Sequence, residues 1–224
     1  MGEKIPKKKS NKLVAAVLVA VILVVTIVGV YVYTQSNQPT SAEKATPITN
    51  FSDGSWANCN ATFYEDEQAY PGAMMTYTIS GTWQNQDCWQ YVENLTWTDT
   101  NGSWVEVDTY YLNKATYQSI GQTCQMTLNG AVYSEDEFTG ADLSNDFERF
   151  SNMTIVSKDA SVTVPKGTFT CTKQQGVIYS AGQQATFDVT VWVKSDIPNW
   201  GIVKYMFYLD GASNAEFLLE SYGS

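Results

Sequence analysis

The chain has 224 residues, a net charge of −10, four cysteines and no histidine. The lack of histidine removes the commonest general base and the commonest ligand of transition metals. A Ser-His-Asp hydrolase and a histidine-ligated zinc enzyme are therefore excluded.

The first feature along the chain is an uncharged, apolar run of 21 residues over positions 13–33. A helix of that length spans about 30 Å, the thickness of the hydrocarbon core of a bilayer. A cleaved signal peptide would have a shorter apolar core and a small-residue cleavage site, which the sequence after Tyr31 lacks. Five basic residues precede the run: Lys4, Lys7, Lys8, Lys9 and Lys12. We therefore predict a basic cytoplasmic tail over 1–12 and a single-pass transmembrane helix over 13–33.

Residues 34–50 are rich in Gln, Ser, Thr and Pro and predict an extended stalk. Residues 51–224 are then expected to form one extracellular domain, since the remaining length suits a single core. Five of the 13 basic residues and one of the 23 acidic ones precede position 34, which leaves a net charge of −14 outside. Such a surface repels nucleic acid, so we expect no nucleic-acid partner.

From residue 51 onward the chain is rich in Thr, Tyr, Trp and Val, with frequent Gly and Asn, as is typical of strands and turns. The clearest hairpin joins residues 91–99 to residues 103–111. Two connections fit it: a two-residue turn at Asn101-Gly102, or a three-residue loop, Thr100-Asn101-Gly102, with Gly102 in the left-handed position of a bulge.

The choice of connection decides which side chains share a face, because a slip of one residue exchanges the two faces. The three-residue loop sets Trp97 against Val105 and Leu95 against Val107, whereas the two-residue turn would set Trp97 and Leu95 against acidic residues. We favour the three-residue loop. It places these side chains on the polar face of the hairpin: Asn94, Thr96, Thr98, Trp104, Glu106 and Asp108.

The last third of the chain repeats the pattern of strands and short turns. Residues 186–194 alternate between apolar and polar side chains, a turn follows at 196–201, and further strands cover 202–209 and 215–222. Other turns are predicted at Asn129-Gly130 and over 164–167. The fold class that follows is mainly β: the transmembrane helix plus one curved antiparallel β-meander or half-barrel.

The four cysteines lie in the predicted extracellular part and lack C-x-x-C spacing, so disulfides are favoured over a zinc or redox site. Three pairings are open. The positions of the neighbouring strands favour Cys59–Cys88 and Cys124–Cys171.

Five Asn-x-Ser/Thr sequons predict glycosylation of the extracellular part. They begin at Asn50, Asn60, Asn94, Asn101 and Asn152. Asn101 is at the tip of a predicted hairpin and Asn94 on a polar face, where a glycan would be accessible.

Two acidic clusters, residues 65–67 and 135–137, are expected outside the strands. Neither has the alternating spacing of a calcium loop, so solvated surface charge is favoured and no metal or cofactor is expected. Trp104 and Trp192 fall on the polar faces of their strands. We expect these two rings to form a surface for a ligand or partner.

Three segments of the last third share an order of motifs with envelope proteins of bacteria and archaea: Val164–Cys171, Val191–Tyr205 and Glu216–Gly223. The chain resembles the lipoprotein-carrier (Lol-type) half-barrel family in these segments. The resemblance covers residues 162–223 and implies a curved antiparallel sheet around an apolar cup. In the family such cups hold lipid chains or only pack the core. The matched motifs are mainly turn and strand sequences, so the resemblance indicates a fold more than a function.

The sequence therefore predicts a membrane-anchored, surface-exposed, non-enzymatic domain with a structural or interaction role. Its expected partners are its own membrane, a lipid or other apolar ligand, and other envelope proteins or glycans. An apolar-ligand receptor is the first alternative. A carboxylate-based glycosidase is the second, since acidic and aromatic residues are abundant but no pair stands out.

Overall fold

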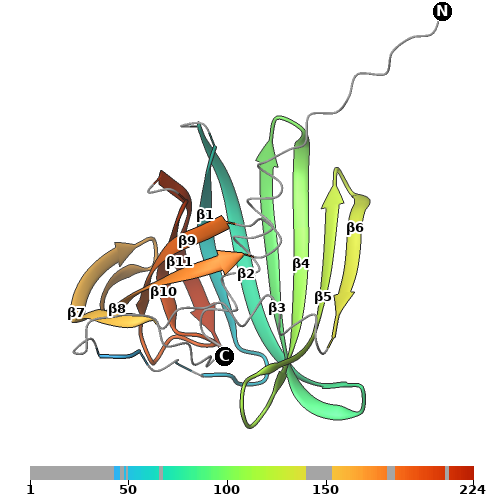
Figure 1. The fold of residues 1–224 in the computed structure, drawn as a ribbon, viewed down its shortest axis with the longest axis horizontal. Helices are drawn as coiled ribbons and strands as arrows, with labels where there is room; N and C mark the ends of the chain where they lie inside the picture. The colour runs from blue at the N-terminus through green and yellow to red at the C-terminus, as the bar shows by residue number, and fades with distance from the viewer. Residues whose placement is uncertain are drawn as a thin grey trace, which may run out of the picture.

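The computed structural model of the chain describes residues 43–45, 48, 50–65, 68–139, 153–180, 185–209 and 212–224. These residues form eleven β-strands in a single antiparallel sheet that is curved and not closed (Figure 1). The strands are β1 (Trp56–Glu65), β2 (Gln68–Trp83), β3 (Gln86–Asp99), β4 (Gly102–Asn113), β5 (Ser119–Leu128), β6 (Ala131–Phe138), β7 (Thr154–Val164), β8 (Gly167–Ser180), β9 (Ala185–Val193), β10 (Ile202–Leu209) and β11 (Ala212–Gly223).

The strand order is β6-β5-β4-β3-β2-β1-β11-β10-β9-β8-β7. Two meanders, β1 to β6 and β7 to β11, therefore meet where the first strand pairs with the last. The mainly β, antiparallel fold predicted from the sequence is confirmed, and each half is the expected up-and-down meander.

The predicted membrane-spanning segment, 13–33, lies outside the described residues. Within the described part of the chain, no helix has the length and apolar character needed to cross a bilayer.

The clearest sequence patterns gave the correct strands and turns. Four alternating apolar side chains of residues 186–194 lie on one buried face of β9, as expected: Phe187, Val189, Val191 and Val193. Asn129 and Gly130 both have positive φ, 52° and 79°, and join β5 to β6 in the two-residue turn that the sequence predicts.

The register predicted for the hairpin of β3 and β4 is wrong. Its loop is only Thr100-Asn101, because Asp99 already pairs with Gly102. The Asp99 carboxylate accepts the backbone N–H of Asn101 at 2.7 Å and that of Gly102 at 3.2 Å, which closes the turn one residue early.

This earlier closure exchanges the faces of β4. Trp97 lies opposite Trp104, and Leu95 lies opposite Glu106. The supposed polar side chains Trp104, Glu106 and Asp108 are consequently buried on the inner face of the sheet.

The inner face of the sheet is packed with large apolar side chains. In the half formed by β7 to β11, the tip of the β7–β8 hairpin folds back and the Lys166 N–H donates to the Leu219 carbonyl of β11 at 3.1 Å. The sheet of β7 to β11 therefore curves so strongly that it encloses its own inward-facing side chains. The largest fully buried ones along the sheet are Phe63, Tyr91, Leu95, Trp104, Tyr110, Met126, Phe187, Trp200, Tyr205, Phe207 and Phe217.

The loop between β9 and β10 ties the two halves together through Asn199. The Asn199 Oδ1 accepts the hydroxyls of Ser55 at 2.8 Å and Thr78 at 2.7 Å, and its Nδ2 donates to Thr76 at 3.3 Å. Asn199 has a φ of 62°, a conformation that asparagine tolerates better than most residues.

The described residues of the predicted stalk lie against the domain. Lys44 forms a bridge with Thr154 at the start of β7, and Asn50 forms one with Asn199. Ile48 packs against the core. The end of this segment is therefore docked on the β domain.

Candidate functional site

Four chemically reactive side chains are buried together on the inner face of β3, β4 and β5. Glu93, Asp108 and Cys124 are paired in register across these three strands, and Glu106 is two residues before Asp108 on the same face. The three carboxyl side chains are 0% exposed and Cys124 is 4% exposed. Buried acids are rare without partners, so this cluster is the most unusual chemical feature of the described residues.

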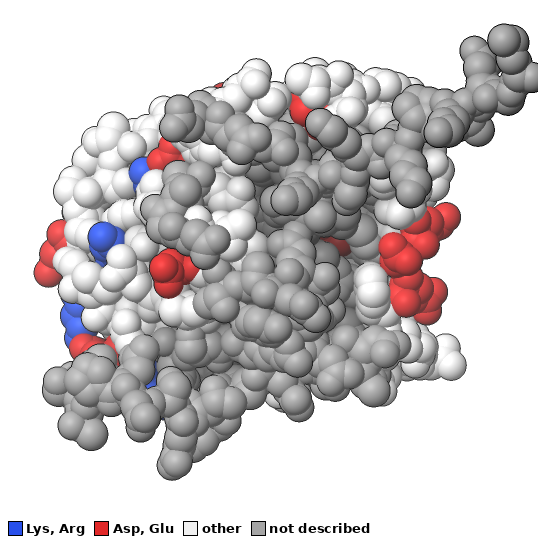
Figure 2. Space-filling model, turned by 45° about the horizontal axis from the view of Figure 1, so that its top comes forward, with Lys and Arg blue, Asp and Glu red and all other residues white. Residues whose placement is uncertain are grey.

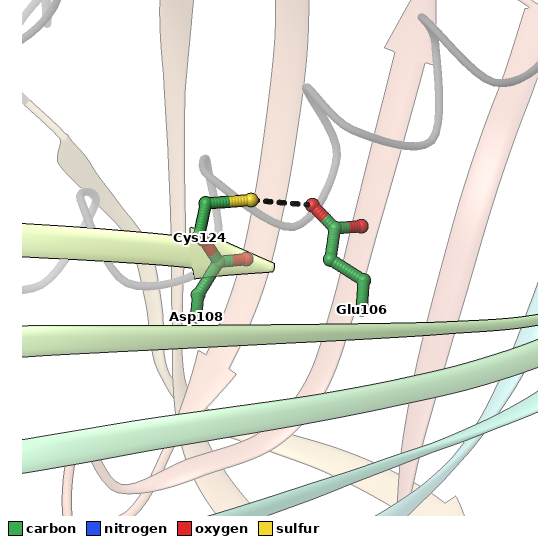
Figure 3. A group of neighbouring side chains, drawn as sticks. All are labelled: Glu106, Asp108 and Cys124. Carbon is green, nitrogen blue, oxygen red and sulfur yellow. Dashed lines mark hydrogen bonds between the residues drawn. The ribbon is translucent and has the colours of Figure 1, made fainter. Parts of the chain in front are cut away.

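The cluster is compact. A carboxylate oxygen of Glu106, one of Asp108 and the Cys124 Sγ all lie within 4.8 Å of one another, and the three side chains point toward a common space (Figure 3). The Cys124 thiol donates to Glu106 Oε1 at 3.8 Å, and Gln122 Nε2 donates to Asp108 Oδ1 at 3.3 Å. The Tyr91 hydroxyl donates to Glu93 Oε1 at 3.0 Å.

Burial favours the protonated form of these groups. It raises the pKa of Glu93 and of Glu106 well above the usual range, and the negative charge of Asp108 raises both further. Burial also raises the pKa of Asp108 to about 6, against hydrogen bonds from Cys124, Gln122 and Glu106 that lower it. The pKa of the Cys124 thiol is raised by burial and by the charges of Asp108 and Glu106.

Several polar atoms of this region have no hydrogen-bond partner among the described residues. They are Glu93 Oε2, Glu106 Oε2, Asp108 Oδ2 and the Tyr110 hydroxyl. Each such buried atom costs about 1–3 kcal/mol. The arrangement is therefore one that a proton donor, a water molecule or a cation would satisfy.

The sequence interpretation missed this cluster because it placed Glu106 and Asp108 on the solvent face. The available signal was Asp99, whose side chain can cap a two-residue turn. Recognising it would have put Glu106 and Asp108 on the same face as Trp97, and Cys124 beside them on the next strand.

The predicted disulfides are absent, since all four cysteines, each within the described ranges, are unpaired and buried. Cys59 lies opposite Met74, which lies opposite Leu95, seven residues along β3 from Cys88. Seven residues of a strand span about 23 Å, far beyond the Cα separation that a disulfide allows. Cys124 and Cys171 are in opposite halves of the sheet, on β5 and β8.

The sequons occupy different environments. Asn60 and Asn101 are exposed, on β1 and in the β3–β4 turn, and Asn50 is exposed while its amide donates to the loop before β10. Asn94 is on the outer face but only partly exposed, and its Oδ1 is buried. Asn152 lies outside the described residues. Asn60 and Asn101 are therefore the most accessible of the described sequons.

The two tryptophans expected on a binding surface are held by neighbours. Trp104 is 1% exposed and stacks on Trp97, with ring centroids 5.7 Å apart, so the prediction of a surface ring is wrong. Trp192 is partly exposed between Lys173 and Lys204, whose amino groups lie 5.1 and 5.4 Å from the ring centroid. It lines an open groove of about 430 Å³ on the outer face of β8 to β10.

The acidic cluster 135–137 is part of β6, so its predicted position outside the strands is wrong. Its three side chains are exposed, and Figure 2 shows acidic side chains gathered at the side of the molecule where β6 lies. Glu65 ends β1, and the other two residues of its cluster are outside the described residues.

No protein-family model matches the chain, and no curated protein sequence does. Among solved structures, the chain is similar to a candidate exported protein with a YmcC-like fold from Bacteroides fragilis. The two share 14% identity and superimpose with a TM-score of 0.39, over 82% of this chain and 100% of that one.

Proposed function

We propose that the chain is a single-pass envelope protein that displays its β domain outside the membrane in a structural or interaction role. The observation that carries the proposal is the 21-residue uncharged run at 13–33 with five lysines before it. The part of the chain that follows, residues 34–224, has a net charge of −14. This strongly charged surface supports a location outside the membrane.

Packing favours this role over that of an apolar-ligand receptor. The inner face of β7 to β11 is filled by its own aromatic and aliphatic side chains. The pocket between β1 to β3 and the β9–β10 loop, beside Tyr91 and Trp200, has a volume of about 20 Å³, little more than one water molecule. An acyl chain on the inner face of β3 and β4 would also meet the carboxyl groups of Glu93, Glu106 and Asp108.

The same burial argues against a carboxylate-based glycosidase. A glycosidase places an acid and a nucleophile or base on either side of a sugar that enters from solvent. Glu93, Glu106 and Asp108 are 0% exposed, so a sugar ring has no access to them. A role without catalysis fits these residues better.

The test is membrane extraction and protease protection of the full chain. The wild-type chain should stay with membranes in alkaline carbonate, and protease added to intact cells should release the β domain. Val21→Arg with Leu23→Arg should abolish retention, since each arginine costs about 2.5–3.5 kcal/mol at the centre of a span. Lys8→Arg is the matched control and should behave as wild type.

Recovery of the wild-type chain in the carbonate-soluble fraction would overturn the anchor. Native mass spectrometry of the detergent-solubilised full chain separates the alternatives for the domain. A stoichiometric added mass that organic solvent removes would replace the proposal with the apolar-ligand receptor.

A further inference from the structure

The cluster on β4 and β5 combines three potential metal ligands of two chemical kinds. Glu106 and Asp108 offer carboxylate oxygens and Cys124 offers a thiolate, all within 4.8 Å of one another. Hard ions such as Ca²⁺ and Mg²⁺ take oxygen ligands, whereas a thiolate beside carboxylates suits a borderline-soft ion such as Zn²⁺. The strands fix these ligands, since Asp108 and Cys124 are directly opposite in register.

A second observation points to a ligand independently of the acidic cluster. The Tyr110 side chain is 0% exposed and its hydroxyl has no hydrogen-bond partner among the described residues. Tyr110 lies on the same inner face of β4, two residues after Asp108. A buried phenol on this face requires an acceptor, and a water or hydroxide bound to a metal ion would supply one.

We propose that Glu106, Asp108 and Cys124 bind a divalent metal ion of the Zn²⁺ type, with Tyr110 and Glu93 beside its remaining coordination position. Three protein ligands and one open position form a common tetrahedral arrangement for zinc. Two carboxylates and a thiolate more than balance the charge of the ion. Binding releases to solvent the proton of the Cys124 thiol and any proton that Glu106 and Asp108 hold.

The competing explanation is that Glu106 and Asp108 share one proton, so that the pair carries a single negative charge. It accounts for two carboxyl groups with oxygens within 4.8 Å of each other. It leaves the Tyr110 hydroxyl without an acceptor, whereas a water or hydroxide on a bound ion would supply one.

The test loads the chelator-treated full chain, in detergent micelles, with ZnCl₂ and separately with CoCl₂. After desalting, elemental mass spectrometry should find one zinc per chain, and cobalt should give a thiolate-to-cobalt charge-transfer band. Cys124→Ala should abolish the band, while Cys171→Ala, which removes an equally buried thiol from the other half of the sheet, should retain it.

Two further variants keep the test decisive even if Cys124→Ala does not fold. Glu106→Gln and Asp108→Asn preserve size and should each weaken zinc binding on the order of 100-fold, with unchanged circular dichroism. Asp188→Asn, at an exposed acidic residue on the outer face of β9, should bind zinc as wild type does. This test is independent of the membrane anchor, so its outcome does not depend on the proposed function.

The proposal is overturned by any of three results. These are zinc content far below one per chain after loading, a cobalt charge-transfer band that persists in Cys124→Ala, or unchanged zinc affinity in both carboxyl variants. Stoichiometric binding of Ca²⁺ with no binding of Zn²⁺ would also overturn it, because the thiolate would then have no part.

Discussion

At the scale of single residues, the carboxyl groups of β3 and β4 make stability depend on pH. Burial raises the pKa of Asp108 from about 3.8 to about 6. Glu93 and Cys124 pair with it, and Glu106 and Tyr110 flank it on β4. Tyr91 of β3 and Asp136 of β6 lie on the same face. The folded state therefore binds more protons than the unfolded state between these two values, and raising the pH destabilises the metal-free domain.

Because raising the pH destabilises the metal-free domain, the variant Asp108→Asn should change how the stability of the chelator-treated full chain depends on pH. At about pH 3, below both pKa values, the variant and the wild type should have similar free energies of unfolding, because the carboxyl group is mostly protonated in both states. Above pH 7 the variant should be more stable by up to about 3 kcal/mol, since the wild type must bury a charge or take up a proton.

Chemical denaturation at about pH 3, 6 and 8 measures the difference. Asp188→Asn is the control, with the same change of charge at an exposed position on the outer face of β9. A constant difference between Asp108→Asn and the wild type across this range would contradict the assignment of the raised pKa to Asp108.

At the scale of strands, the sequence predicted most elements but not how two of them pair. The strand β9 and the Asn129-Gly130 turn could be predicted because each sequence pattern fits only one local structure. The β3–β4 hairpin has apolar side chains on both faces, with Val105 and Val107 on one and Trp104 and Leu112 on the other. Hydrophobic pattern therefore could not choose the register, and the side chain of Asp99 did.

The candidate site was unpredictable for the same reason. Glu93, Asp108 and Cys124 are separated in the chain and meet only when β3, β4 and β5 pair in the observed register. A shift of one residue between β3 and β4 would turn Glu106 and Asp108 to solvent. Composition alone gave no sign that acidic residues would be buried, since acids are usually exposed.

Strand β6 forms one edge of the sheet, and its charges protect that edge. An open edge presents unpaired backbone groups to which another chain can add. Glu135, Asp136 and Glu137 are consecutive and exposed there. We expect these acids to prevent pairing between the edges of two molecules.

Replacing all three acids by threonine should cause self-association, because threonine favours strands and carries no charge. Light scattering coupled to size-exclusion chromatography measures it. The matched control replaces the same residues by lysine, which restores a charged edge and should leave the chain as wild type. If the threonine variant has the mass of the wild-type particle, the edge needs no such protection.

At the scale of the whole molecule, charge is divided unevenly between the halves of the sheet. Residues 51–139 hold twelve acidic residues against Lys114 alone, whereas residues 153–224 hold six acidic residues against five lysines. Cations are therefore attracted toward the half that contains β3 to β5. This asymmetry supports delivery of a metal ion to the proposed site.

The sheet also keeps the cysteines apart. We expect the non-reduced chain to have the intact mass of the fully reduced one, and four alkyl groups to add after unfolding in iodoacetamide. In the folded state alkylation should be slow, because the four thiols are buried. A mass two or four hydrogens lower, or fewer than four alkyl groups, would contradict the unpaired state.

The pairing of β1 with β11 at the middle of the sheet has a consequence for biosynthesis. A chain that emerges from the ribosome in order presents β1 to β6 first, with one side of β1 open until residues 212–223 have been made. The complete sheet thus cannot form before β11 has been made, and the early half waits with an unpaired central strand. Closure of the sheet is then timed by the synthesis of residues 212–223.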